Sequence, residues 1–187
     1  RLVSIVDCGV KRDPAYGVYR DGLAEGVFCE RPDGRPLHAP VWPGWCAFPD
    51  FTDPRARAWW GMQYRRLTSA GIAGFWHDMN EPAAFTAWGD RTLPLGTRHA
   101  LEGRGGDHRE AHNVYGLLMA RAACEALHEI RPESRPWIVS RSGWAGLQRY
   151  AWSWTGDTDS TWPALRATVA TVLGLGLSGL PFTGPDI

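Results

Sequence analysis

The sequence predicts the α/β fold class, and within it a partial (β/α)8 TIM barrel of about five βα units. Short apolar segments alternate with longer amphipathic ones, as expected for parallel strands connected by helices. The number of such units falls short of the eight that close a barrel in about 250 residues. We therefore expect residues 1–187 to be the central fragment of a single barrel domain. A charged residue follows each apolar segment, where the strands of a barrel open on one mouth: Asp7, Asp78, Arg141, Asp157 and Asp186.

The first third of the chain is expected to hold one strand, one long loop and one helix. Residues 2–6, LVSIV, form a strand that ends at Asp7. Residues 14–51 are rich in Gly, Pro and aromatic side chains, which indicates a long loop. Asp53 and Pro54 begin a helix, since proline is favoured in the first turn. The buried face of this helix and its end are predicted at Trp60, Tyr64, Leu67 and Gly71.

The middle of the chain continues the alternation. Residues 74–76, GFW, form a strand just before Asp78, and a polar loop follows over about residues 86–112. Residues 113–130 form a helix that Pro132 stops. Ala123, Leu127 and Ile130 mark its inward face.

The last third adds three strand ends and one helix. Residues 137–140, WIVS, form a strand that delivers Arg141, and another strand reaches Trp154 close to Asp157. Residues 180–183 form a final strand that delivers Asp186. Between them lies a helix over residues 163–175, with its apolar face directed inward at Leu165, Val169, Val172 and Leu173.

The amino-acid composition argues against some classes of binding partner. Lys plus Arg equals Asp plus Glu, 20 against 20, so no basic excess favours nucleic acid or an anionic membrane. No apolar stretch approaches the roughly 20 residues that span a bilayer. The first residues, RLVSIVDCG, lack both a signal-peptide layout and an initiator Met, and we expect a cytoplasmic location. The four cysteines show no CxxC pairing and are expected to be buried free thiols.

Two acidic positions indicate carbohydrate chemistry. In GFWHDMNEP, residues 74–82, an apolar strand stops at Asp78, and Glu81 follows three residues later. Asp157 is flanked by tryptophans, and the chain has eleven of them. Flat aromatic faces can stack on sugar rings, and paired carboxylates can cleave a glycosidic bond. We expect the following tryptophans to surround Asp157: Trp152, Trp154 and Trp162.

His108 and His112, in HREAH, are four residues apart and could face one metal ion. Their order differs from the HExxH of zinc proteases. We expect solvated histidines at a loop-to-helix junction, and no metal site.

Five motifs in order resemble glycoside hydrolase family 31, the α-glucosidase family. They are VWPG followed by FPDFTDP, GFWHDMNEP, RSGWAG with QRY, WTGD followed by Trp162, and GPDI. The resemblance runs from Ile5 to Ile187. It implies that the first strands, the last strand with its histidine and the flanking β-domains of the family lie outside this span.

The resemblance implies a role for nine residues. Asp78 matches the family's nucleophile and Asp157 its acid/base. The residues that hold the hydroxyls of the reacting glucose are matched by Asp7, Arg141 and Asp186. The walls of that subsite are matched by Trp42, Trp76, Met79 and Trp154.

The implied reaction is the release of α-linked glucose from non-reducing ends, with retention, through a covalent glycosyl-enzyme intermediate. The substrate would be an oligosaccharide or a small α-glucoside, with no cofactor. A cation such as Arg141 favours the ionised form of Asp78, tryptophans disfavour the charge on Asp157, and Glu81 is expected to brace the nucleophile loop by hydrogen bonds.

Alternatives remain open at this point. An α-xylosidase or an α-transglycosylase could use the same scaffold. A non-catalytic carbohydrate-binding relative would be expected to lose one of the two aspartates, whereas Asp78 and Asp157 are both present. A metal-dependent phosphoryl enzyme would need a phosphate-binding loop that the sequence does not contain.

Overall fold

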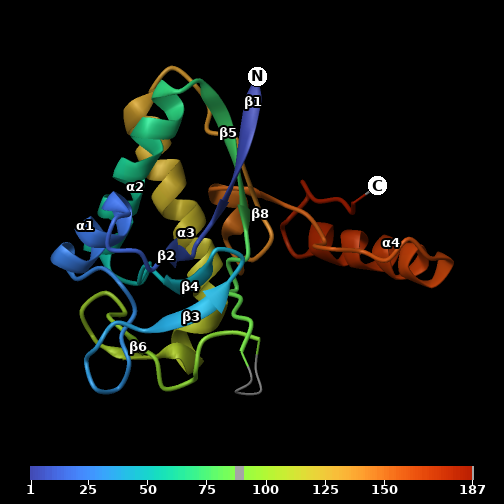
Figure 1. Ribbon diagram of the computed structural model, residues 1–187. Coiled ribbons are helices and arrows are strands. Elements are labelled where there is room, and N and C mark those ends of the chain that lie inside the picture. Colours follow the sequence, from blue (N-terminus) through green and yellow to red (C-terminus); the bar gives the residue numbers. More distant parts are fainter. Residues whose placement is uncertain (87–90, 187) are drawn as a thin grey trace.

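A four-stranded parallel sheet organises the molecule. The computed structural model describes residues 1–86 and 91–186. The sheet contains β1 (Leu2–Asp7), β5 (Ile72–Asp78), β8 (Ile138–Ser140) and β9 (Trp152–Ser153) in the order β1-β5-β8-β9. All three strand pairs are parallel. α-Helices lie between β1 and β5 and between β5 and β8 (Figure 1), whereas only the short 3-10 helix Leu147–Arg149 lies between β8 and β9. The predicted α/β alternation is confirmed.

One face of the sheet carries the core. The helices α2 (Pro54–Ser69) and α3 (His108–Ile130) lie side by side on this face (Figure 1). Alternation along β5 turns Phe75 and His77 toward these helices. The ring of Phe75 meets Tyr64 edge-on at 4.7 Å, and the Tyr64 hydroxyl lies 2.8 Å from His77 Nε2. Burial lowers the pKa of His77 to about 3, so the ring stays neutral inside the core.

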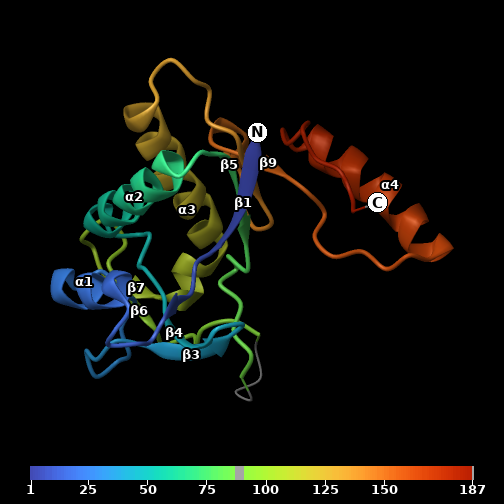
Figure 2. The ribbon, with the colours of Figure 1, turned by 45° about the horizontal axis from the view of Figure 1, so that its top comes forward.

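The opposite face of the sheet is open. Ile5 and Trp76 are paired on neighbouring strands, and they are 50% and 40% exposed. The helix α4 (Trp162–Leu177) projects away from the sheet in both views (Figures 1 and 2). No residue of α4 is buried, so the helix was predicted correctly but its inward face was wrong. Of the positions that we expected inside, Leu165, Val169 and Leu173 are exposed and Val172 is only half-buried.

We predicted a long loop over residues 14–51, and this was wrong. These residues contain most of a small subdomain. It comprises α1 (Gly17–Glu25) and an antiparallel sheet of β2 (Val10–Lys11), β4 (Gly44–Ala47) and β3 (His38–Val41). Gly26 ends α1 with φ 62°, and Gly44 turns the β3–β4 hairpin with φ 97°, conformations that favour glycine. The small sheet lies at the C-terminal end of β1 (Figure 1). It can therefore contribute residues to the mouth of the parallel sheet.

The expected polar loop over residues 86–112 is also structured outside residues 87–90, which the structure does not describe. It contains the short strands β6 (Arg98–His99) and β7 (Gly106–Asp107). Helix α3 begins at His108 and not at 113, because the Asp107 side chain caps it by accepting from the Arg109 amide at 3.0 Å.

The final strand, predicted over residues 180–183, is not formed as a regular strand. The amides of Ser153 and Thr155 nevertheless donate to the carbonyls of Phe182 and Gly184, at 3.1 and 3.0 Å. An extended segment thus runs beside β9. The four cysteines are free and buried, as predicted. No helix in the described part of the chain is long and apolar enough to cross a membrane.

Candidate active site

The C-terminal ends of three neighbouring strands bring charged groups together. Asp7 and Asp78 are the last residues of β1 and β5 and are register partners. Arg141 follows β8, and its backbone amide donates to the His77 carbonyl at 3.0 Å, which extends the β5–β8 ladder to the site. The side chains of Asp78 and Arg141 are 15% and 18% exposed. The predicted convergence of these three residues is therefore present.

Arg141 connects two carboxylates. Its Nη1 lies 2.7 Å from Asp78 Oδ1, an ion pair outside hydrogen-bond geometry. Its Nε and Nη2 donate to the two oxygens of Glu81 at 2.9 and 2.8 Å, a bidentate pair that fixes the plane of the guanidinium. Ser142 Oγ also donates to Glu81. Glu81 therefore sets the position from which Arg141 meets Asp78, in agreement with its expected bracing role.

The electrostatics follow from these contacts. Burial alone would raise the pKa of Glu81, but the hydrogen bonds from Arg141 and Ser142 and the charge of Arg141 outweigh it and lower that pKa. The pKa of Arg141 is raised, first by its hydrogen bonds to Glu81. Burial, and then the charge of Asp78, raise the pKa of Asp7, although Arg141 opposes the shift. The site thus contains carboxyl groups in unlike surroundings.

A layer of neutral groups supports residues 78–82, the loop of the predicted nucleophile, which is called the nucleophile loop below. The buried amide of Asn80 donates to Ser140 Oγ at 2.8 Å and accepts from the Ser142 amide at 3.1 Å. Met79 has φ 56°, the left-handed region that a residue with a side chain seldom occupies, and its Sδ lies 3.1 Å from Arg141 Nη2. Met79 is buried. It therefore lies under Arg141 and not in an open wall.

Gly116 of α3 approaches both loops of the site. A Cβ at this position would lie 2.7 Å from the Ser142 carbonyl oxygen and 3.0 Å from that of Asn80. Both separations are too short for a carbon atom, so only glycine lets the helix approach so closely. Sequence reasoning missed Asn80, Ser142 and Gly116, since nothing local distinguishes them.

Two aromatic pairs flank the strand ends. Trp76 and Trp154 meet edge-on, with ring centroids 5.5 Å apart. Trp42, at the tip of the β3–β4 hairpin, is 71% exposed and meets Phe85 edge-on at 4.6 Å. The Phe85 amide donates to the Pro40 carbonyl at 2.8 Å, which attaches the segment after the nucleophile loop to the hairpin. Phe85 was not predicted, although an aromatic residue soon after GFWHDMNEP was visible.

The surroundings of Asp157 differ from the prediction. Asp157 is exposed, and two of the three expected tryptophans, Trp152 and Trp162, do not form a buried aromatic surrounding for it. Trp152 packs against Trp137 and Phe182, while Trp162 is 83% exposed. Closeness in sequence did not indicate which face each ring occupies. Gly156 lies against the aliphatic part of Arg141, so the backbone next to Asp157 does reach the site.

Asp186 is exposed near the C-terminal end of the described chain. It lines the same surface hollow as Thr158 and Asp159, the residues just after Asp157. The structure thus places Asp186 beside the Asp157 loop, and it shows no hydrogen bond between Asp186 and Asp7, Asp78 or Arg141.

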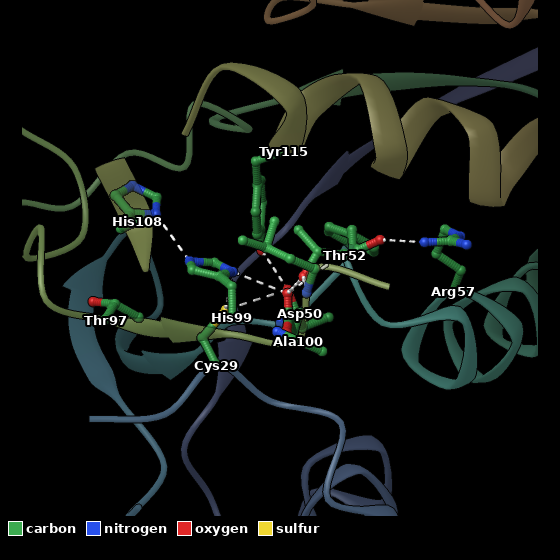
Figure 3. Close-up of polar contacts among 12 residues, drawn as sticks. Cys29, Asp50, Thr52, Arg57, Thr97, His99, Ala100, His108 and Tyr115 are labelled. Atoms are coloured by element: carbon green, nitrogen blue, oxygen red, sulfur yellow. Dashed lines mark hydrogen bonds and ion pairs between the residues drawn. The ribbon is translucent and has the colours of Figure 1, made fainter. Parts of the chain in front are cut away.

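A second polar cluster is formed by residues of the core (Figure 3). Asp50, His99 and His108 are all buried, with Asp50 Oδ1 2.9 Å from His99 Nδ1 and His99 Nε2 3.0 Å from His108 Nδ1. The expectation of a solvated His108 was wrong, because β6 brings His99 against it. Cys29 Sγ is 3.8 Å from His99 Nδ1.

Cys29, Asp50 and His99 are the set of described side chains whose geometry could suit a metal ion, with ligand atoms within 4.8 Å of one another. Hydrogen bonds already use these atoms. Asp50 also accepts from the amides of Thr52 and Ala100, at 3.1 and 2.6 Å. The set is therefore better described as a hydrogen-bonded cluster than as a metal site.

The fold and this site agree with the comparisons to known proteins. The family model for the glycosyl hydrolases family 31 TIM-barrel domain matches residues 1–187. Alpha-glucosidase 2 of Bacillus thermoamyloliquefaciens is 42% identical over the whole chain, which covers 24% of that relative. A family 31 alpha-glucosidase from Bacteroides thetaiotaomicron superposes with a TM-score of 0.82 at 41% identity, over 98% of this chain and 29% of that one.

The alpha subunit of glucosidase II, in a form bound to α3-Glc2, superposes with a TM-score of 0.91 at 30% identity. The match covers all of this chain and 20% of that subunit. The architecture is thus that of part of a TIM-barrel domain, and the chain spans about a quarter of the length of the relatives it matches. This chain belongs to glycoside hydrolase family 31.

Proposed function

We propose that this chain provides the catalytic centre of a retaining, exo-acting glycoside hydrolase that releases α-linked glucose from non-reducing ends. The observation that carries the proposal is the contact between Asp78, at the end of β5, and Arg141, at the end of β8. A guanidinium beside a carboxylate stabilises the charged form that a nucleophile requires. Family membership and the names of the relatives support the same reaction class.

The proposed reaction assigns one step to each aspartate. A carboxylate oxygen of Asp78 attacks the anomeric carbon and forms the glycosyl ester, while the leaving oxygen takes a proton from Asp157. Water then gives its proton to Asp157, attacks the same carbon and displaces Asp78. Two inversions yield net retention. The exposure of Asp157 in this structure is compatible with a group that must reach both the leaving oxygen and water.

The remaining residues are proposed to bind the sugar. Asp7, Arg141 and Asp186 would contact hydroxyl groups, while Trp42, Trp76 and Trp154 would provide apolar faces. Met79 would act indirectly, since it is buried against Arg141. We further propose that residues 1–187 are the central part of one (β/α)8 catalytic domain, and that the open sheet face is covered by the rest of that barrel.

The proposal is tested with the full-length protein on maltose and on an aryl α-glucoside. Proton NMR at early times should show release of α-glucose before mutarotation, as retention requires. If β-glucose is the first anomer released, the retaining mechanism is contradicted. Preferential cleavage of an aryl α-xyloside, or transfer products longer than the substrate, would favour the α-xylosidase or the transglycosylase alternative.

A further inference from the structure

A chain of hydrogen bonds connects the buried cluster to the nucleophile loop. Beyond the contacts of Asp50, His99 and His108, His108 Nε2 lies 3.1 Å from Thr92 Oγ1. Thr92 Oγ1 in turn donates to the carbonyl oxygen of Pro82 at 2.7 Å. Pro82 is the last residue of the loop that begins with Asp78. The chain therefore runs without a break from a buried carboxylate to the loop that carries the proposed nucleophile.

The direction of each hydrogen bond can be deduced by counting protons from Pro82. A carbonyl oxygen only accepts, so the single hydroxyl hydrogen of Thr92 goes to Pro82. The nitrogen of His108 that faces Thr92, Nε2, must then donate. One proton then lies between His108 Nδ1 and His99 Nε2. Burial favours the neutral form of His108, so its Nδ1 accepts and His99 Nε2 donates.

The count ends at Asp50. His99 Nδ1 faces Asp50 Oδ1, an oxygen that already accepts from the Thr52 amide and hydroxyl. An ionised carboxylate accepts only, so Nδ1 of His99 donates as well. A positive imidazolium then faces a negative carboxylate in the core, where each compensates the buried charge of the other.

The surroundings agree with this distribution of charge. Burial, then the charges of His99 and His112, lower the pKa of His108 to about 3, so His108 stays neutral. Burial would raise the pKa of Asp50, but the hydrogen bond and charge of His99 outweigh it and lower that pKa. Burial raises the pKa values of Cys29 and Tyr115, the titratable groups beside the His99 ring, so both remain uncharged.

We propose that four side chains are positioning residues for the loop that carries Asp78: those of Asp50, His99, His108 and Thr92. In this arrangement His99 holds a proton on each ring nitrogen, whereas His108 holds one on Nε2 alone. Both ends of the chain, the Pro82 carbonyl and the ionised Asp50 carboxylate, only accept, so the two imidazole rings between them together hold three protons. The loop is thereby held at Pro82, four residues from Asp78, by a series of linked hydrogen bonds that each have one donor direction. The catalytic consequence rests on the proposed function, whereas the proton positions do not.

Neutron diffraction from crystals of the full-length protein, grown in deuterated buffer at pH 7, tests the proton positions directly. We expect deuterons on both Nδ1 and Nε2 of His99, on Nε2 alone of His108, and on Thr92 Oγ1 along the line to Pro82. A single deuteron on His99, or a deuteron on His108 Nδ1, would overturn the assignment. This measurement needs no catalytic activity, so it is independent of the proposed reaction.

Two substitutions at Thr92 test the positioning role. In the full-length protein, Thr92→Val removes the hydroxyl that donates to Pro82. We expect kcat on an aryl α-glucoside to fall by about tenfold with little change in KM, because one buried hydrogen bond that positions the loop is lost. Thr92→Ser keeps the hydroxyl and should restore kcat. Thr68→Val is the matched control, because Thr68 Oγ1 also donates to a backbone carbonyl, that of Tyr64 at 2.9 Å, but on α2 away from the loop.

Wild-type kcat in Thr92→Val, or an equal loss in Thr92→Ser, would overturn the positioning role. If the wild-type protein cleaves no glycoside, the proposed function fails on its own, and the crystal structure of Thr92→Val becomes the readout. A shift of Pro82 relative to α3 then supports positioning, and an unmoved Pro82 overturns it.

Discussion

Asp7 and Asp78 occupy partnered positions at the ends of two parallel strands, so two carboxyl groups meet at one mouth. The pair is not symmetric. Arg141 forms its ion pair with Asp78, while burial, and then the charge of Asp78, raise the pKa of Asp7. A carboxyl group that retains its proton more readily can donate a hydrogen bond to a sugar oxygen. The asymmetry therefore suits Asp78 for attack and Asp7 for binding.

The first prediction concerns Asp78. In the full-length protein, Asp78→Asn should lower turnover by about four orders of magnitude or more, because an amide cannot form the glycosyl ester. Asp78→Ala with added azide should regain part of the activity on an activated aryl α-glucoside and give the β-glucosyl azide, which NMR identifies. Near-normal turnover of Asp78→Asn would rule out Asp78 as the nucleophile.

The second prediction concerns Asp157. Asp157→Ala should slow cleavage of maltose by about 10²–10⁴-fold, since a poor leaving group needs protonation. An aryl glucoside with an acidic phenol should be affected far less in its first step. The comparison of kcat/KM for the two substrates checks this. Equal losses on both would mean that Asp157 only shapes the pocket.

The third prediction concerns Glu81. Glu81→Gln keeps the shape but removes the charge that orients Arg141, and kcat should fall about 10–100-fold, the effect of a small misplacement at a reacting centre. Glu133→Gln, which changes an exposed glutamate outside the site, is the control and should match wild type. A Glu81→Gln variant with wild-type kcat would show that Arg141 is held by other contacts.

Glu81 also makes a pH-dependent contribution to stability. Because its pKa in the folded protein is lowered below the ordinary value of 4.5, its stabilisation is fully present above about pH 4.5 and is lost as pH falls through the folded-state value. The difference in Tm between wild type and Glu81→Gln should therefore be largest near pH 6 and shrink toward pH 3. A Tm difference that stays constant over that range would contradict the cited contacts.

The fourth prediction concerns residues 1–187 expressed alone. We expect an aggregating, inactive polypeptide, because the open sheet face and α4 leave large apolar side chains in water, with Leu177 92% exposed and Leu2 66% exposed. Size-exclusion chromatography and a thermal melt check this. A monodisperse preparation that melts cooperatively and cleaves maltose would show that these strands close a core unaided.

Local signals predicted the parallel units well. Strand β5 and its terminal Asp78 were evident because an apolar run stops abruptly at an acid. Helix α2 was recognised from its cap, and the structure shows the Asp53 side chain accepting from the Arg55 amide at 2.8 Å. The predicted gathering of Asp7, Asp78 and Arg141 followed from strand direction alone.

The misses depended on contacts far along the chain. His108 was expected in solvent, but its neighbour His99 is held by Asp50, 49 positions earlier. The bond that fixes Arg141 to Glu81 spans 60 positions. The apolar face of α4 was expected to point inward, but no residue of this helix is buried, and periodicity cannot say which surface such a face would meet.

Gly116 has a consequence for anyone who wishes to redesign this pocket. A Cβ at this residue would lie 2.7 Å from the carbonyl oxygen of Ser142 and 3.0 Å from that of Asn80, on the two loops that hold Asp78 and Arg141. Even a methyl group there would push both loops outward together and change the spacing of the two charges at once. Directed evolution of new sugar specificity is thus better aimed at the hairpin tip, where the side chain of Trp42 is 71% exposed.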